Sequence, residues 1–103
     1  MSELFGLHGR LLAREGGGDE LEAILLEAAE ALNANRDCLL YVVSRQPDDP
    51  EAVWVTEAWT SREAHRASLE DPATRALIQR AMPLIAEPPS RGTELRPVAG
   101  KGL

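Results

Sequence analysis

The stretch AVWVTEAWTSREAHRASL, residues 52–69, changes its hydrophobic period partway along, and this change decides the fold. In its first half one set of side chains alternates with another, as on a β-strand with two distinguishable faces. The two sets are Val53, Val55, Glu57 and Trp59, and Trp54, Thr56 and Ala58. In the second half Thr60 stands three residues before Glu63, the spacing of a capping box that opens a helix. We therefore predict a strand that ends in a carboxylate and an indole, and a helix with His65 near its start.

The same two periods place the other elements on either side of this stretch. Strands are predicted at residues 4–13, 38–45 and 93–98, and the short polar turn 46–50 should make its two flanking strands pair antiparallel. A first helix is predicted from Asp19, with Glu22 completing a second capping box. Asp71 and Pro72 should open another helix, and Pro83 should kink or end it.

The predicted order of strand, helix, strand, strand, helix, strand is typical of a ferredoxin-like α+β sandwich, βαββαβ, with one antiparallel sheet. The 103 residues fit a single domain, 1–103, with a C-terminal tail at 99–103. Both faces of the predicted strands are largely apolar, so the face without helices must also be covered. A second copy of the sheet would cover it, which predicts a homodimer in the form of a dimeric α+β barrel.

Composition excludes several classes of function. A formal charge of -6, from 17 acidic and 11 basic residues, argues against a nucleic acid or an anionic membrane as partner. No apolar run approaches the ~20 residues that cross a bilayer, and the N-terminus lacks the pattern of a signal peptide. One cysteine and two histidines are too few for a structural zinc site, so no metal is expected. A reducing, cytoplasmic location is the simplest interpretation.

Several motifs, taken in order, give the chain a family likeness. They are Phe5-Gly6-Leu7, Asp19-Glu20-Leu21, Cys38-Leu39-Leu40-Tyr41, Glu57-Ala58-Trp59, His65-Arg66-Ala67-Ser68-Leu69, Pro83-Leu84-Ile85-Ala86 and Pro97-Val98. With these motifs the chain resembles the antibiotic biosynthesis monooxygenase superfamily, in particular its small quinol monooxygenase-like members. It departs from the family pattern at Arg36-Asp37, where Pro-Gly is usual, and at Ser68, where many relatives have a histidine.

The resemblance implies a dimeric protein that oxygenates a quinol or polycyclic phenol with O₂ and without a cofactor. Such chemistry needs a deprotonated, electron-rich substrate and a pocket that excludes water. Two alternatives remain open. One is a non-catalytic small-molecule-binding or regulatory dimer, and the other is a haem-binding or haem-degrading protein, which would need an iron ligand from His65 or His8.

Five side chains are candidates for the site, each with a structural alternative. His65 could take the substrate proton or face solvent, and a buried Glu57 could act as a base or be held in a structural pair. Trp59 could supply a flat wall for an aromatic substrate or pack in the core. Tyr41 and His8 could contact the substrate, or they could be a packed sheet tyrosine and a histidine bonded to a polar neighbour.

Overall fold

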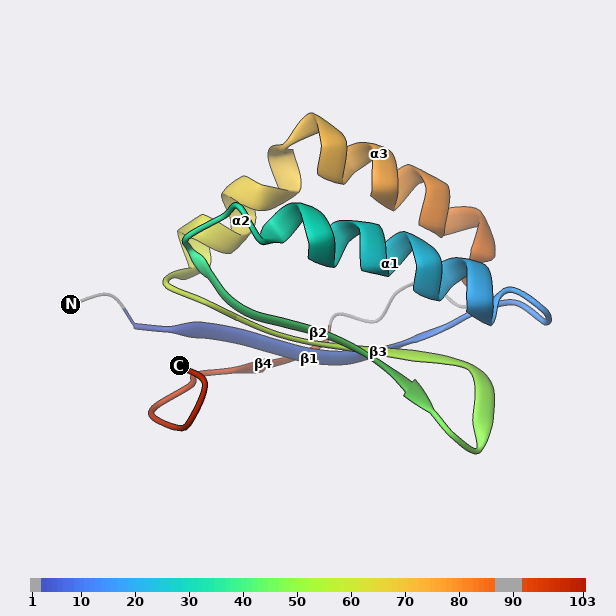
Figure 1. The fold of residues 1–103 in the computed structure, drawn as a ribbon, viewed down its shortest axis with the longest axis horizontal. Coiled ribbons are helices and arrows are strands. Elements are labelled where there is room, and N and C mark those ends of the chain that lie inside the picture. The colour runs from blue at the N-terminus through green and yellow to red at the C-terminus, as the bar shows by residue number, and fades with distance from the viewer. Residues whose placement is uncertain (1–2, 87–91) are drawn as a thin grey trace.

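The computed structural model describes residues 3–86 and 92–103. It has a four-stranded antiparallel sheet in the order β2-β3-β1-β4, with the helices on one face (Figure 1). The elements are β1 (Phe5–Leu12), α1 (Gly18–Leu32), β2 (Cys38–Gln46), β3 (Asp49–Trp59), α2 (Arg62–Glu70), α3 (Pro72–Ala81), the 3₁₀ helix η1 (Met82–Leu84) and β4 (Thr93–Leu95). The predicted ferredoxin-like α+β fold is confirmed.

The central strand β3 shows the predicted alternation. Val53 and Trp59 face the helices and are fully buried, whereas Trp54 and Thr56 lie on the opposite face and are partly exposed. Glu57 stands opposite Leu7 of β1 and Tyr41 of β2, so these three side chains share the helix-covered face. The register therefore places a carboxylate and a phenol under the helices.

Both predicted capping boxes are wrong, although both helices exist. The α2 N-cap is Ser61, whose hydroxyl accepts from the Ala64 amide at 3.0 Å, while the Thr60 hydroxyl donates to Asp37. At α1 the N-cap is Gly17, which has no side chain to offer.

The carboxylate that satisfies the start of α1 comes from β3 instead. Glu51 accepts from the amides of Gly16 and Gly18, the latter at 2.9 Å. A negative charge is favourable at this end of a helix, whichever element supplies it. Asp19, the predicted cap, pairs at 3.0 Å with Arg45 of β2, which ties the helix to the sheet edge.

The later boundaries follow the sequence signals more closely. Asp71 accepts from the amides of Ala73 and Thr74 and Pro72 opens α3, as predicted. The helix ends at Ala81, and Pro83 lies in η1. The last strand is shorter than predicted and ends at Leu95, two residues before Pro97, which has no amide to donate.

Close backbone packing explains the glycine at position 9 of β1. A Cβ added to Gly9 would lie 2.8 Å from the Cα of Gly92, which leads into β4. The core itself lies between sheet and helices and includes Leu21, Ile24 and Val53. In the part of the chain that the structure describes, no helix is long and apolar enough to cross a membrane.

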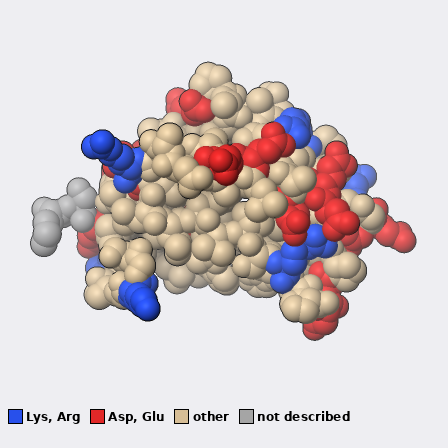
Figure 2. Space-filling view, viewed as in Figure 1, with Lys and Arg blue, Asp and Glu red and all other residues tan. Residues whose placement is uncertain are grey.

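The outer face of the sheet carries no covering element among residues 3–86 and 92–103 (Figure 1). Leu40, Val42 and Leu95 are 37%, 43% and 49% exposed there. Acidic side chains gather at the end of the molecule where α1 begins, interspersed with basic ones, whereas the middle below the helices is covered by uncharged side chains (Figure 2). By the strand register, the three exposed apolar residues lie on the sheet face that points away from the helices.

Candidate functional site

A cavity of about 240 Å³ lies between the sheet and the helices. Apolar side chains from α1, α3 and η1 form most of its wall, and five polar or aromatic side chains enter it from β2, β3 and α2. The lining residues are Leu11, Ile24, Leu25, Ala28, Leu32, Tyr41, Glu57, Trp59, His65, Ser68, Leu69, Thr74, Leu77, Ile78, Ala81, Met82 and Ile85. An apolar wall with a few convergent polar groups is the usual composition of a small-molecule site.

Three of the predicted site residues form one cluster in this cavity. The Trp59 indole N–H donates to Oε1 of Glu57 at 2.8 Å, and Nε2 of His65 lies 3.4 Å from the same oxygen. The His65 and Trp59 rings meet edge to face with centroids 5.5 Å apart. The end of β3 and the first turn of α2 therefore bring an acid, a base and an indole together.

Burial controls the charge of this cluster. Only 13% of the Glu57 side chain and 16% of the His65 side chain are exposed. Burial raises the pKa of Glu57, and the Trp59 hydrogen bond opposes part of that rise. Burial also lowers the pKa of His65, with the positive charge of Arg62 adding to the effect.

These directions decide how the contact between Glu57 and His65 is best described. An ion pair would lower the carboxyl pKa and raise the imidazole pKa, which is the opposite of both shifts. Loss of hydration therefore outweighs their mutual attraction, so burial disfavours the charged form of each group. Such a pair can accept a proton from a ligand without first giving up a strong ion pair.

Tyr41 enters the cavity from β2, opposite Glu57. Burial raises the pKa of its hydroxyl, and the charge of Glu57 acts in the same direction. The hydroxyl therefore keeps its proton near neutral pH and is available as a hydrogen-bond donor.

His8 lies away from this cluster, on the outer face of the sheet. Its Nδ1 is 2.9 Å from the Thr56 hydroxyl, and its ring stacks on Trp54 with centroids 5.2 Å apart. The structure thus brings four of the five predicted site residues into one cavity and places His8 on the other side of the sheet from it.

The sequence interpretation missed the cavity wall that the helices contribute. Leu25, Ala28 and Leu32 recur at helical spacing, and that periodicity is the signal that marks the face of α1 that meets the cavity. Leu32, Ser68 and Thr74 also line a more polar cleft of about 470 Å³ beside the cavity. No sequence signal marks that cleft, because its residues come from separate segments.

The arrangement defines the class of protein: a small α+β domain with an apolar cavity and a buried acid–base pair at one side. Among the residues that the structure describes, no group of three or more His, Cys, Asp or Glu side chains could hold a metal ion. Proton transfer to or from a small ligand is the chemistry that these side chains can perform.

Comparison with known proteins places the chain within this class. It belongs to the antibiotic biosynthesis monooxygenase family, whose model matches residues 4–80. A solved structure from Chloroflexus aurantiacus J-10-fl, whose name assigns it to the same family, is 42% identical to this chain in sequence. The match covers 94% of this chain and 95% of that chain, with a TM-score of 0.84.

Two further solved structures share the fold at lower identity. One, from Caulobacter crescentus CB15, is 22% identical, and the match covers 95% of this chain and 92% of that chain with a TM-score of 0.86. The other, from Nitrosomonas europaea, is 13% identical, and the match covers 95% of this chain and 93% of that chain with a TM-score of 0.87. A search of curated proteins gave no match.

Proposed function

We propose that this protein is a cofactor-independent monooxygenase that acts on a quinol or a polycyclic phenol with O₂. The observation that carries the proposal is the buried Glu57–His65 pair beside an indole in an otherwise apolar cavity. The family supports a monooxygenase as the class of activity. A quinol presents a flat apolar ring and a hydroxyl proton, which match the wall and the pair respectively.

In this proposal His65 accepts the hydroxyl proton, and Glu57, in contact with the same imidazole, stabilises the imidazolium that forms. The Tyr41 hydroxyl donates to the substrate oxyanion, and Trp59 lies against the ring. The apolar wall excludes water, so that the electron-rich anion meets O₂ without competing hydration.

The overall reaction balances without an external reductant. A phenol with a free ring position gives up two hydrogens and gains one oxygen atom to become a quinone, and the second oxygen atom leaves as water. The substrate supplies all four electrons that reduce O₂, so the protein has to supply only binding and proton transfer.

Oxygen uptake with a panel of quinols tests the proposal. Wild type should consume O₂ above the uncatalysed rate. His65→Ala removes the proposed general base, so its kcat should fall by roughly 10²–10⁴-fold. Trp59→Ala should weaken substrate binding. His8→Ala and Trp54→Ala are matched controls on the outer face and should retain activity, because their rings do not line the cavity.

Two outcomes would instead support the alternatives. If a quinol binds but no quinol is oxidised above the uncatalysed rate, the protein is a non-catalytic binding or regulatory protein. If added haem gives a Soret shift that His65→Ala abolishes, the cavity takes haem; without a Soret shift the haem alternative fails.

We further propose that a second copy of the chain covers the outer face of the sheet. Leu40, Val42 and Leu95 are exposed there, and three apolar side chains on one sheet face favour association with a similar face. Light scattering should give a dimer mass for wild type and a monomer mass for Val42→Glu. Leu26→Glu is the control, because Leu26 is 50% exposed on α1, and a monomeric wild type would refute the proposal.

A further inference from the structure

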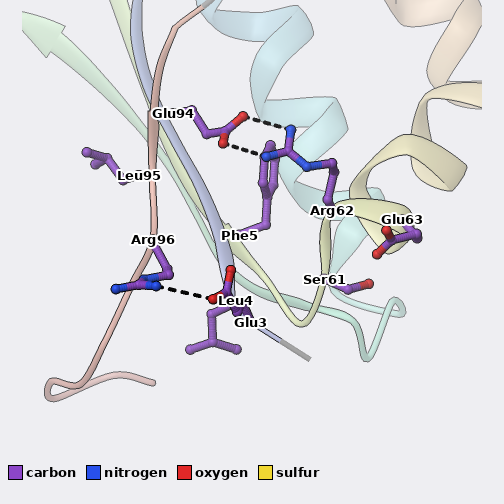
Figure 3. A pocket seen from close by; sticks show the side chains of 9 residues that line it. All are labelled: Glu3, Leu4, Phe5, Ser61, Arg62, Glu63, Glu94, Leu95 and Arg96. Carbon is purple, nitrogen blue, oxygen red and sulfur yellow. Dashed lines mark hydrogen bonds and ion pairs between the residues drawn. The ribbon is translucent and has the colours of Figure 1, made fainter. Parts of the chain in front are cut away.

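Arg62, the first residue of α2, is held in place from two sides. Its guanidinium donates two hydrogen bonds to the carboxylate of Glu94 in β4, at 2.7 and 2.5 Å. Its Cζ lies 4.8 Å from the centroid of the Phe5 ring in β1 (Figure 3). Both contacts lie in a cleft of about 350 Å³ outside the cavity. Arginine suits this place better than lysine, because its planar guanidinium can make both hydrogen bonds to one carboxylate and lie over an aromatic ring.

Phe5 connects this cleft to the cavity. Its side chain is buried, and its ring centroid is 5.0 Å from that of His65. His65 in turn reaches Glu57 at 3.4 Å. A continuous series of contacts therefore runs from Glu94 through Arg62, Phe5 and His65 to Glu57.

We propose that Arg62 is a positioning residue for His65. Through Phe5 it holds the imidazole in position, and its own positive charge disfavours protonation of that ring. The inference rests on the proposed function insofar as that function gives His65 the task of accepting a proton. Glu94 and Phe5 fix the guanidinium near α2, and the fixed charge opposes formation of a second cation at His65.

The charged and titratable groups around His65 make this effect specific. Glu57 faces it from β3, and Arg62 acts on it from its own helix. The Glu57 carboxylate favours the imidazolium, whereas Arg62 disfavours it, so the two charges oppose each other. The direction found for the His65 pKa, downward from burial first and Arg62 second, agrees with the geometry.

A second arginine in the chain provides a matched control. Arg80 also donates two hydrogen bonds to one carboxylate, that of Glu27, at 3.1 and 2.8 Å. The two pairs are about equally exposed, at 49% and 52% for Arg62 and Glu94 and at 54% and 53% for Arg80 and Glu27. Removing either pair costs a similar surface interaction, but only Arg62 contacts Phe5.

The test is an NMR titration of the His65 ring in ligand-free Arg62→Met, Arg80→Met and wild-type protein. We expect the His65 midpoint to rise in Arg62→Met and to stay at the wild-type value in Arg80→Met. The difference should shrink as salt rises from ~0.01 to ~1 M, since Arg62 is half exposed and its charge is screened.

Arg62→Lys separates charge from geometry. Lysine keeps the positive charge but cannot make the two parallel hydrogen bonds to Glu94. The His65 midpoint in Arg62→Lys should therefore lie between those of wild type and Arg62→Met. If quinol oxidation is found, the acid limb of kcat/KM should move to higher pH in Arg62→Met and move back in Arg62→Lys.

The inference is overturned if the His65 midpoint in Arg62→Met equals that in Arg80→Met, or falls. This result is independent of turnover. A raised midpoint in a protein that oxidises no quinol would leave the role of Arg62 intact and refute only the proposed function.

Discussion

Replacement of Trp59 by phenylalanine should destabilise the protein by an amount that depends on pH. The indole is 1% exposed, and its N–H donates to Glu57 at 2.8 Å. Phenylalanine keeps an aromatic ring in the core but removes the donor and the extra carbons of the indole. The carboxylate then loses a hydrogen bond that favours its charged form.

The magnitude follows from two parts. The two buried carbons that are lost contribute about 0.8 kcal/mol each, or about 1.6 kcal/mol together. The lost hydrogen bond contributes about 1.5–3 kcal/mol when Glu57 is ionised and about 0.5–1.5 kcal/mol when it is neutral. The free energy of unfolding should therefore fall by about 3–4.5 kcal/mol at high pH and by about 2–3 kcal/mol at low pH.

The sign follows from linkage. Because burial raises the pKa of Glu57, the folded state holds this proton more tightly than the unfolded state does. Its contribution to stability is fully present below the unfolded pKa and is lost as pH rises through the folded pKa. Removing the Trp59 donor raises that pKa further, so the loss on going to high pH becomes larger.

Urea unfolding at fixed protein concentration, at about pH 4 and about pH 8, measures both values. Trp54→Phe is the matched control, because its indole N–H also donates to a side-chain oxygen, that of Gln46, which does not titrate. Its destabilisation should be the same at both pH values, within error. An equal loss at both pH values for Trp59→Phe would refute the argument that the hydrogen bond depends on the charge of Glu57.

Three further changes test the helix starts and the close packing of β1, each by urea unfolding. Ser61→Ala should cost about 1 kcal/mol through loss of the α2 cap, and a cost near zero would contradict the assignment of Ser61 as N-cap. Glu51→Gln should cost about 1–2 kcal/mol, because two amides at the start of α1 lose a charged acceptor, and Glu20→Gln on the exposed face of α1 should cost much less. Gly9→Ala should cost about 1–3 kcal/mol, because the new Cβ meets the backbone of Gly92 at 2.8 Å; an unchanged stability would mean that β4 moves freely.

The order and type of the main elements could be predicted from the sequence because each depends on local chemistry. The alternation from Val53 to Trp59 and the Asp71-Pro72 start of α3 are signals that neighbouring residues carry by themselves. The two wrong caps show where such signals fail. Thr60 and Asp19 had suitable spacing, but Asp37 and Arg45, distant in sequence, bind their side chains instead.

In the candidate site, too, local sequence patterns predicted some features and tertiary packing decided the others. The sequence by itself determined that Glu57 and Trp59 share a strand face and that His65 lies in the first turns of the following helix, since these follow from periods of two and 3.6 residues. Only the tertiary structure decided that His65 turns to Glu57 rather than to solvent, that Tyr41 joins them and that His8 does not. The physical reason is that a side chain's burial, and with it the pKa of Glu57 and His65, is set by the elements packed above it, which no local pattern records.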